Sequence, residues 1–264
     1  MTLANFLPNR FHDNVDIFTT PSTVTNTQWQ VWRKRPGITM IYILCIGGAG
    51  GGGGGFTGVA GTARGGGGGG GSSAVTKVIV PAFLIPDELF VQVGAGGTGR
   101  DSGGGTAGSG VLSYVAIAQD ITATNCIAVS GAAAAVGGGT GTVAAVGAAG
   151  TAGTIAAIAA MPLAGIGQYE LIAGNIGTAG GAVTGAVGGD QTFPSTSVIT
   201  LGGTGGGGVT GTGFAGGLIT SVTGSYLSEQ RPVNAGVGKS GSGGYNLWKP
   251  FFSYCGMGGG SANA

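Results

Sequence analysis

The sequence has very little charge. Lysine, arginine, aspartate and glutamate make up 7% of its 264 residues, and the formal net charge is +1. An ordinary soluble domain carries about 25% charged residues. The sequence has no basic face and no interleaving of aromatic and basic side chains, so we expect no nucleic-acid partner. Its one basic cluster, Arg33-Lys34-Arg35, is typical of a solvated turn and not of a phosphate site.

Histidine and cysteine are scarce as well. His12 is the only histidine, and Cys45, Cys126 and Cys255 lie far apart without a CxxC spacing. This pattern excludes a typical zinc site and a disulfide scaffold, and a single histidine leaves a Ser-His-Asp triad little to build on. We therefore expect no metal and no cofactor. Cys45 lies inside an apolar run and is interpreted as a small buried hydrophobe.

The acidic residues are few and scattered. Asp87 and Glu88 are adjacent, and on a strand their side chains would point apart. Two carboxylates that meet in space, as in glycosidases, are the arrangement that would contradict a non-enzymatic role. We interpret the others as loop or capping residues, and predict that the protein is not an enzyme and has no catalytic residues. These others are Asp101, Asp120, Glu170, Asp190 and Glu229.

Long apolar segments are also missing. No charged side chain occurs from Ile121 to Tyr169, but the strongly apolar residues there never run for the ~20 positions that a membrane span needs. We therefore expect no membrane insertion. The first 28 residues contain acidic side chains and no apolar core of a signal peptide. We interpret 1–28 as an extended arm, a candidate for docking on a partner.

Glycine is what the sequence has in abundance, with 64 residues. Ordering so many glycines is costly in conformational entropy, yet the chain is 42% hydrophobic with a mean hydropathy of +0.39, which favours a folded protein. Polyproline II helices have three residues per turn, and without side chains they can pack side by side. We predict that the glycine tracts form such a packed mass; floppy loops are the alternative. The tracts are 47–71, 94–110, 131–190 and 202–217.

The remaining segments have the alternation and β-branched content of strands. The apolar run 38–46 is predicted to be a strand buried on both faces. The fold class is therefore mostly β, with sandwich-like or jelly-roll-like strands, extended polyglycine layers and little helix. We expect an arm over 1–28, a β domain over 29–130, and an Ala/Gly-rich region over 131–264. Further strands are predicted over 28–32, 75–80, 89–93, 111–118, 125–131, 196–203 and 217–224.

Two glycine patterns resemble nucleotide sites. Gly48 to Gly53 fits G-x-G-x-x-G, but the helix that would hold a pyrophosphate cannot follow, because more glycine does. The segment 234–241 resembles the end of a P-loop without its strand, its helix or its first glycine. We expect no nucleotide at either.

The aromatic cluster near the C-terminus is predicted to plug the glycine-rich body; a binding platform is the alternative. It comprises Tyr245, Trp248, Phe251, Phe252 and Tyr254.

One stretch resembles a known family. Trp32, then Pro36-Gly37, then the apolar strand ITMIYILCI and the burst GGAGGGGGG are similar to the glycine-rich domain of phage tail-fibre and virion proteins. LFVQVGAGGTG at 89–99 resembles that family's next strand-and-glycine element. The resemblance covers about 29–118; beyond it only composition agrees. The glycine-packed tip adhesins of phage tail fibres are a looser parallel. PAFLIPDELF replaces the family's short turn, and no fibre-shaft repeat is present.

The resemblance implies a virion location and a non-enzymatic structural role, as a capsid, spike or fibre component that self-assembles through its glycine layers. Expected partners are further copies of the chain, most simply as a trimer, and other virion proteins through residues 1–28. A second hypothesis is a receptor-binding adhesin that recognises a glycan or protein on the host surface. A third is a self-assembling extracellular filament unrelated to viruses. The sequence does not identify the binding residues of any of these.

Overall fold

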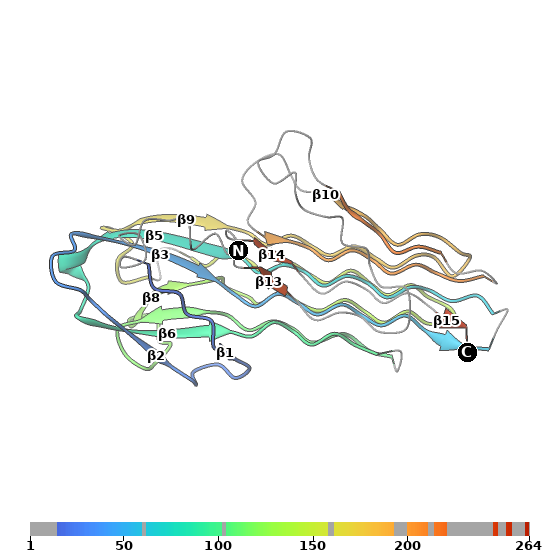
Figure 1. Cartoon of the computed structure of the whole chain (residues 1–264), viewed down its shortest axis with the longest axis horizontal. Coiled ribbons are helices and arrows are strands. Elements are labelled where there is room, and N and C mark those ends of the chain that lie inside the picture. The colour runs from blue at the N-terminus through green and yellow to red at the C-terminus, as the bar shows by residue number, and fades with distance from the viewer. Residues whose placement is uncertain are drawn as a thin grey trace, which may run out of the picture.

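The computed structural model confirms a mainly β fold (Figure 1). Among the described residues the only helix is a short 3-10 turn, η2 (Ala82–Leu84), and none is an α-helix. The low helix content follows from glycine density, which costs about 1 kcal/mol per residue in a helix. The structure describes residues 15–59, 62–101, 104–157, 161–192, 200–210, 214–220, 245–247, 252–254 and 262–263.

The first sheet has three antiparallel strands in the order β3-β5-β9, which are β3 (Met40–Ile46), β5 (Val75–Pro81) and β9 (Gln168–Ile172). β5 is central, but its pairing with β9 ends at Ile79, so Pro81 lies beyond the ladder on that side. This agrees with the requirement that proline avoid central ladder positions. The sequence did not predict β9, because five mixed residues inside an Ala/Gly-rich region give little strand signal.

The second sheet is built around β6 (Glu88–Gly94), which pairs antiparallel with β7 (Tyr114–Ala116) on one side. On the other side it pairs with β2 (Gln30–Arg33) and, at its end, in parallel with β1 (Pro21–Ser22). β8 (Cys126–Val129) completes the sheet beside β7. Part of the predicted N-terminal arm, the segment around β1, is therefore incorporated into this sheet; residues 1–14 lie outside the described part of the chain.

A hydrophobic core lies between the two sheets, which makes this part a β-sandwich. β3 and β5 contribute side chains from one sheet, and β6, β7 and β8 from the other. Tyr169 of β9 donates its hydroxyl hydrogen to the Ile127 carbonyl across the sandwich at 2.9 Å. The buried members of the core are Ile41, Cys45, Val78, Val80, Ala82, Ile85, Leu89, Val115, Ile127 and Ala128.

The prediction that 38–46 is buried on both faces is wrong. β3 is an edge strand of its sheet, and its alternate residues Met40 and Tyr42 are 53% and 58% exposed. Ile79, the cross-strand partner of Tyr42 on β5, is 39% exposed. The reason is that this sheet has the core on one side only. The part of its outer face around Met40, Tyr42 and Ile79 is therefore apolar and accessible, while Lys77 and Glu170 pair further along the same face. An apolar run in sequence does not distinguish such exposure from burial.

Short strands occur in the second half of the chain and beside the glycine runs. They pair as β10 with β12, β11 with β14, β14 with β13, and β4 with β15. Their bounds are β4 (Thr57–Gly58), β10 (Gln191–Thr192), β11 (Thr200–Leu201), β12 (Ile219–Thr220), β13 (Tyr245–Leu247), β14 (Phe252–Tyr254) and β15 (Ala262–Asn263).

Many strands continue directly into an extended, glycine-rich run. β3 leads into run 47–55, and run 64–72 leads back into β5. Figure 1 shows these runs as long, gently waving threads that lie side by side and extend away from the sandwich. We call the set of runs the glycine lattice, its end at the sandwich proximal, and its other end distal. The runs are 47–55, 64–72, 94–100, 106–112, 134–142, 146–154, 173–181, 186–190, 202–208 and 214–218.

The hydrogen bonds of the lattice repeat every three residues. The N–H groups of Gly50 and Gly53 donate to the carbonyls of Gly71 and Gly68, at 2.9 and 2.8 Å. Three residues per turn is the period of the polyproline II helix, which makes no internal hydrogen bonds and directs its backbone groups outward. The polyproline II helix requires a negative φ at each residue. Among the described glycines, positive φ occurs only at Gly37, Gly104, Gly105 and Gly185, all outside the runs or at their turns.

Run 64–72 lies at the centre of the lattice, and hydrogen bonds join it to five other runs. It donates N–H groups to two of them and accepts from three. A Cβ atom on any glycine from 65 to 71 would overlap a backbone carbonyl oxygen of a neighbouring run. The glycine tracts predicted as a packed mass are thus ordered core here. The five neighbours are 47–55, 134–142, 146–154, 173–181 and 202–208.

The spacing of glycine differs between inner and outer runs. Every residue of run 64–72 is buried, and seven consecutive positions are glycine. In run 146–154 only Gly147, Gly150 and Gly153 are buried, while alanine, threonine and valine occupy most positions between them. An outer run needs glycine only on the face that meets its neighbours. Consecutive glycines therefore indicate an inner run, and a glycine at every third position indicates an outer run.

Sandwich and lattice both include residues on either side of position 130. β9 pairs with β5, and Gly138 donates its N–H to the Gly51 carbonyl at 2.9 Å. The division into a β domain over 29–130 and a second region over 131–264 stays a prediction about the chain's organisation.

Candidate functional site

All the turns between paired runs lie at the distal end of the lattice. Because each run leaves the sandwich and the next returns to it, the connections gather on one surface, far from the sandwich (Figure 1). We call this surface the distal loops. They are the connections between residues 55 and 64, 100 and 106, 142 and 146, 181 and 186, and 208 and 214, of which 60–61, 102–103 and 211–213 lie outside the described residues.

The described side chains of the distal loops are mostly small, apolar or hydroxylated. Val59 is 75% exposed and Val143 56%, and Thr184 is also exposed. Arg100 folds over its own loop, where its Nε donates to the Gly104 carbonyl at 3.0 Å. Positive φ at Gly104 and Gly105, which side chains rarely adopt, lets this loop turn tightly. Such a surface suits contact with a neutral partner rather than a strongly charged one.

Arg64, the first residue of run 64–72, stabilises the first distal loop. Its side chain is fully buried, and its Nη2 donates to the Thr62 hydroxyl at 2.8 Å. Its backbone exchanges two hydrogen bonds with Val209, of 2.8 and 2.9 Å. Burying a guanidinium costs free energy unless its N–H groups are hydrogen-bonded. The backbone bonds between Arg64 and Val209 also hold the first and last distal loops in a fixed relation.

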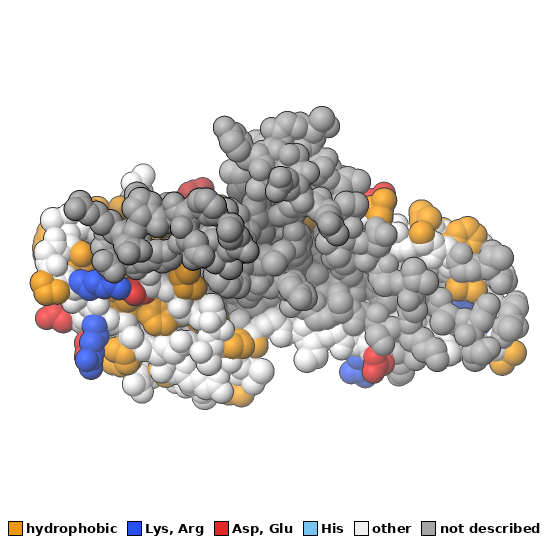
Figure 2. Space-filling view, viewed as in Figure 1, with side chains coloured by type: hydrophobic (Ala, Val, Ile, Leu, Met, Phe, Trp, Pro, Cys, Tyr) orange, Lys and Arg blue, Asp and Glu red, His pale blue; other side chains and the backbone are white. Residues whose placement is uncertain are grey.

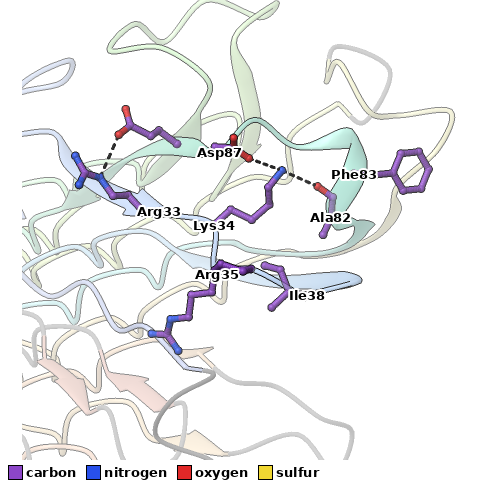
Figure 3. Close-up of a pocket in the computed structure, with 10 residues that line it drawn as sticks. Arg33, Lys34, Arg35, Ile38, Ala82, Phe83 and Asp87 are labelled. Carbon is purple, nitrogen blue, oxygen red and sulfur yellow. Dashed lines mark hydrogen bonds and ion pairs between the residues drawn. The ribbon is translucent and has the colours of Figure 1, made fainter.

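A second candidate site is an open depression of about 680 Å³ at the end of the sandwich that is farthest from the lattice (Figure 3). The predicted basic cluster lines it, and each of its three side chains is paired with a carboxylate. Lys34 contacts Asp87 at 2.9 Å and also donates to the Ile85 carbonyl at 2.7 Å. The other ion pairs are Arg33 with Glu88 at 3.1 Å and Arg35 with Asp16 at 2.6 Å.

The pairings of Arg33 and Lys34 fix the turn that joins β2 to β3 against the connection between β5 and β6. Phe83 of η2 lines the rim of the depression and is 82% exposed. Asp87 and Glu88 engage different cations, as expected for adjacent residues whose side chains point apart. The cations of this site are therefore already neutralised by its own acidic residues.

Two of the other scattered carboxylates, Glu170 and Asp190, have partners from distant segments of the chain. Glu170 pairs with Lys77 across β9 and β5 at 2.9 Å, and Asp190 accepts the Leu218 N–H at 2.7 Å. Asp120 adds, after burial, to the rise in the pKa of the Cys126 thiol. Asp101 is exposed in a distal loop. Glu229 and the only histidine, His12, lie outside the described residues.

Two cysteines are buried within the sandwich. Burial raises the pKa of the Cys45 thiol to about 12, with a smaller contribution from Cys126. Burial, then Asp120, raises the pKa of Cys126 to about 11. Both are free thiols and protonated at neutral pH, so neither is a nucleophile there. Cys45 donates instead to the Ser113 carbonyl at 3.3 Å.

The two nucleotide-like patterns have different outcomes. Residues 48–53 do not open a helix: they belong to run 47–55, which continues to β4, and a Cβ on Gly48 or Gly51 would overlap a neighbouring carbonyl. The P-loop-like segment 234–241 lies outside the described residues.

Of the aromatic cluster, Tyr245 lies on β13 and Phe252 and Tyr254 on β14, while Trp248 and Phe251 are not described. The plug therefore stays a prediction.

Figure 2 shows few charged side chains on this face of the molecule. In the part of the chain that the structure describes, no group of three histidine, cysteine or acidic residues is placed to hold a metal ion. None of the described helices is long and apolar enough to span a membrane. Comparison of the chain with known protein families and with curated proteins finds no match.

Sequence reasoning did not identify the distal loops as a surface. Glycine tracts of similar length, each interrupted by a few larger residues such as FTGVAGTAR at 56–64, were the available signal. If each glycine tract forms a straight run, each interruption between two tracts forms a turn that reverses the chain. Every second turn then lies at the same end of the lattice.

Proposed function

We propose that this chain is a non-enzymatic structural protein of a virion surface, in which the glycine lattice is a rigid stem. The observation that carries the proposal is the continuity of strand and run. The sandwich fixes the proximal ends of the runs, and each run leads to or from the distal loops. A fold of this kind holds a surface at a set distance from a body, which suits a spike or fibre component.

Rigidity follows from the hydrogen-bond network of the lattice. Run 64–72 is joined to five others, and its backbone meets theirs with no side chains between. A run cannot bend without breaking bonds that are buried from water, and each unpaired buried group costs about 1–3 kcal/mol. Nine residues of polyproline II helix span roughly 28 Å. Such a body is better suited to bearing a surface than to opening and closing around a substrate.

The virion assignment rests on the sequence resemblance, and the fold is compatible with it. Both landmarks of the resemblance are strand-and-run units: β3 with run 47–55, and β6 with run 94–100. Their runs lie side by side, because Gly97 and Arg100 donate to the carbonyls of Ala49 and Gly52. The two landmarks thus form one structural unit, as expected if they belong to one domain type.

The outer face of the first sheet supports self-assembly. Met40, Tyr42 and Ile79 expose apolar surface on adjacent strands. Burying such a surface is favourable at about 25 cal/mol per Å². We propose that copies of the chain associate through this face, with a trimer as the expected state.

Electron microscopy of the purified chain, with its mass measured by light scattering, tests this proposal. We expect discrete particles of one copy number that dissociate when Tyr42→Glu is introduced. Ile166→Glu, an equally exposed apolar site in the 161–166 turn, is the matched control and leaves the particles intact. Open-ended filaments would favour the extracellular-filament hypothesis, and a monomer at high concentration would overturn self-assembly.

The distal loops favour a second candidate function, a receptor-binding adhesin. Their position at the end of a stiff stem, with Val59 and Val143 exposed, suits contact with a glycan or protein on a host cell. Fluorescently labelled protein is tested on a panel of bacterial strains. Val59→Glu and Val143→Glu should abolish binding to any strain that the unchanged chain binds. Phe83→Glu, at the end of the sandwich farthest from the lattice, should not. No binding to any strain, or equal binding by all variants, contradicts the hypothesis.

A further inference from the structure

β3 has one paired edge and one free edge. It pairs with β5 on one side, and no described strand pairs with it on the other. The Ala82 N–H donates to the Thr39 carbonyl at 2.8 Å, which fixes the residues whose backbone groups face β5. Because these groups alternate in direction along an antiparallel strand, the odd-numbered residues of β3 face β5 and the even-numbered residues face outward.

The chain itself closes one end of this outward side. Ile46 directs its carbonyl outward, and the Ser113 hydroxyl donates to it at 2.6 Å. Within the described chain, by contrast, no residue bonds the outward backbone groups of Met40, Tyr42 and Leu44. We call these three residues the free edge of β3. It lies on the part of the strand that is farther from the lattice.

The free edge lacks the features by which proteins protect an edge strand. Natural edges carry charge, proline or a bulge, each of which discourages pairing with another chain. No charged residue occurs from Pro36 to Ala63, and the pairing of β3 with β5 is regular along the whole strand. Met40 and Tyr42 are 53% and 58% exposed, so a further strand has access to them.

We propose that the free edge pairs with the free edge of a second copy of the chain, antiparallel and across a two-fold axis at Tyr42. In that register Tyr42 lies opposite Tyr42 of the second copy, and Met40 lies opposite Leu44 of the second copy. Each such pair exchanges two backbone hydrogen bonds, because only outward-facing residues meet. The two sheets β3-β5-β9 then become one continuous sheet.

A second copy fits this edge because the edge is its own complement. Two uncharged strands meet without the repulsion that like charges opposite each other would cause. The outward side chains also match, since Met40 and Leu44 would form apolar cross-strand pairs on the outer face. A two-fold axis at Tyr42 is the register that pairs all three outward residues and leaves Ile46, whose carbonyl is already bonded to Ser113, outside the contact.

This contact differs from the association proposed above, which uses side chains of the outer face. It does not depend on the proposed function, because it is argued from the backbone groups of one strand. Paired antiparallel strands direct the two lattices in opposite directions, so the distal loops lie at the two ends of the pair. A trimer formed through the outer face would then be half of a particle of six copies.

Cysteine cross-linking tests the register. Tyr42→Cys should form a disulfide between two copies when oxidised by dissolved oxygen, and a covalent dimer should appear on a non-reducing gel. The reason is that the Cα atoms of a hydrogen-bonded antiparallel pair lie about 5.5 Å apart, within the range that a disulfide spans. Met40→Cys, on the same face and similarly exposed, is the matched control. It should not link to itself, because Met40 of the second copy lies four residues along the strand, about 14 Å away.

A proline substitution tests the backbone contact independently. Leu44→Pro removes one outward N–H, which an edge strand tolerates, and should halve the particle mass measured by light scattering. Leu44→Ala shortens the same side chain but keeps the N–H, and should leave the mass unchanged.

Several outcomes would overturn the proposal. Equal cross-linking by the two cysteine variants, or none by Tyr42→Cys, excludes the register, also if the proline variant does not fold. An odd number of copies in the unchanged protein excludes the two-fold contact but leaves a trimer through the outer face intact. A monomer in which the amides of Met40 and Leu44 are protected from hydrogen exchange would assign the edge to the same chain.

Discussion

At the scale of single residues, glycine serves two physically distinct purposes. At Gly37 and Gly185 it allows a positive φ that other residues rarely adopt. At Gly68 the φ is not unusual, and the missing side chain is what matters: a Cβ there would overlap the Ala148 carbonyl of run 146–154. The first use makes turns and the second makes close packing. The two uses predict different responses to substitution.

Gly68→Ala should lower the free energy of unfolding by about 3 kcal/mol or more, since overpacking against a rigid neighbour costs at least the usual 1–3 kcal/mol. Chemical denaturation of the purified protein measures this. Gly165→Ala, where nothing lies near the new methyl group, is the control and should change it by less than about 0.5 kcal/mol. Equal effects of the two substitutions would mean that the runs are not packed as described.

Cys45 gives the sandwich a dependence on alkaline pH. Burial raises the pKa of its thiol from 9.0 to about 12 in the folded protein. Below pH 9 both states hold the proton, and the contribution is fully present. Between pH 9 and 12 the unfolded chain releases protons that the folded chain retains, so the free energy of unfolding falls as pH rises. Cys45→Ala should make this fall shallower in denaturation curves across that range; an unchanged slope contradicts the assignment.

At the scale of elements, the boundary between strand and run is stabilised by buried serines. A pleated ladder repeats every two residues and a polyproline II run every three, so their hydrogen bonds do not match where one becomes the other. The Ser113 hydroxyl donates to the Ile46 carbonyl at 2.6 Å and accepts the Gly94 N–H at 2.9 Å. The Ser130 hydroxyl accepts the Ser113 N–H at 3.0 Å. Side chains thus satisfy backbone groups that neither ladder reaches.

Ser113→Ala should destabilise the fold by about 1–3 kcal/mol, because it leaves one buried N–H and one buried carbonyl without a partner. Thermal unfolding followed by circular dichroism measures the change. Thr124→Ala, which removes an exposed hydroxyl paired only with Thr122 at 3.3 Å, is the control and should be near neutral. A neutral Ser113→Ala would show that water replaces the hydroxyl.

The sequence predicts elements where side chains are large and fails where they are small. β3, β5 and β6 were predicted within two residues of their bounds, since valine, isoleucine and leucine mark them. β9 was missed, and β3 was assigned two buried faces when it has one. The glycine tracts predict close packing, but they do not predict which runs are neighbours. Because the glycines are identical, the sequence does not indicate that Gly66 donates to Gly181 and Gly68 to Gly139. That pairing depends on where each run leaves the sandwich.

At the scale of the whole molecule, the lattice has an inside and an outside. Run 64–72 is buried throughout, whereas run 146–154 is buried only at every third residue. Local opening requires fewer broken contacts at the outside than at the centre. The lattice should therefore be most stable along its axis and least stable at its margin.

Amide exchange should reproduce this order. Gly66 and Gly69 of the central run should exchange more slowly than Gly147 and Gly150 of the outer run, although all four donate hydrogen bonds of similar length to lattice carbonyls. NMR exchange on the folded protein at a single pH makes the comparison directly. Faster exchange in the central run would contradict its position at the core.

The alignment of the runs also determines how the molecule would respond to mechanical load. Every run lies along the long axis, between the sandwich and the distal loops (Figure 1). A tensile force applied between those ends would act across the hydrogen bonds in shear, loading several at once instead of unzipping them singly. The stem should accordingly resist pulling far better than it resists peeling of a marginal run from its side.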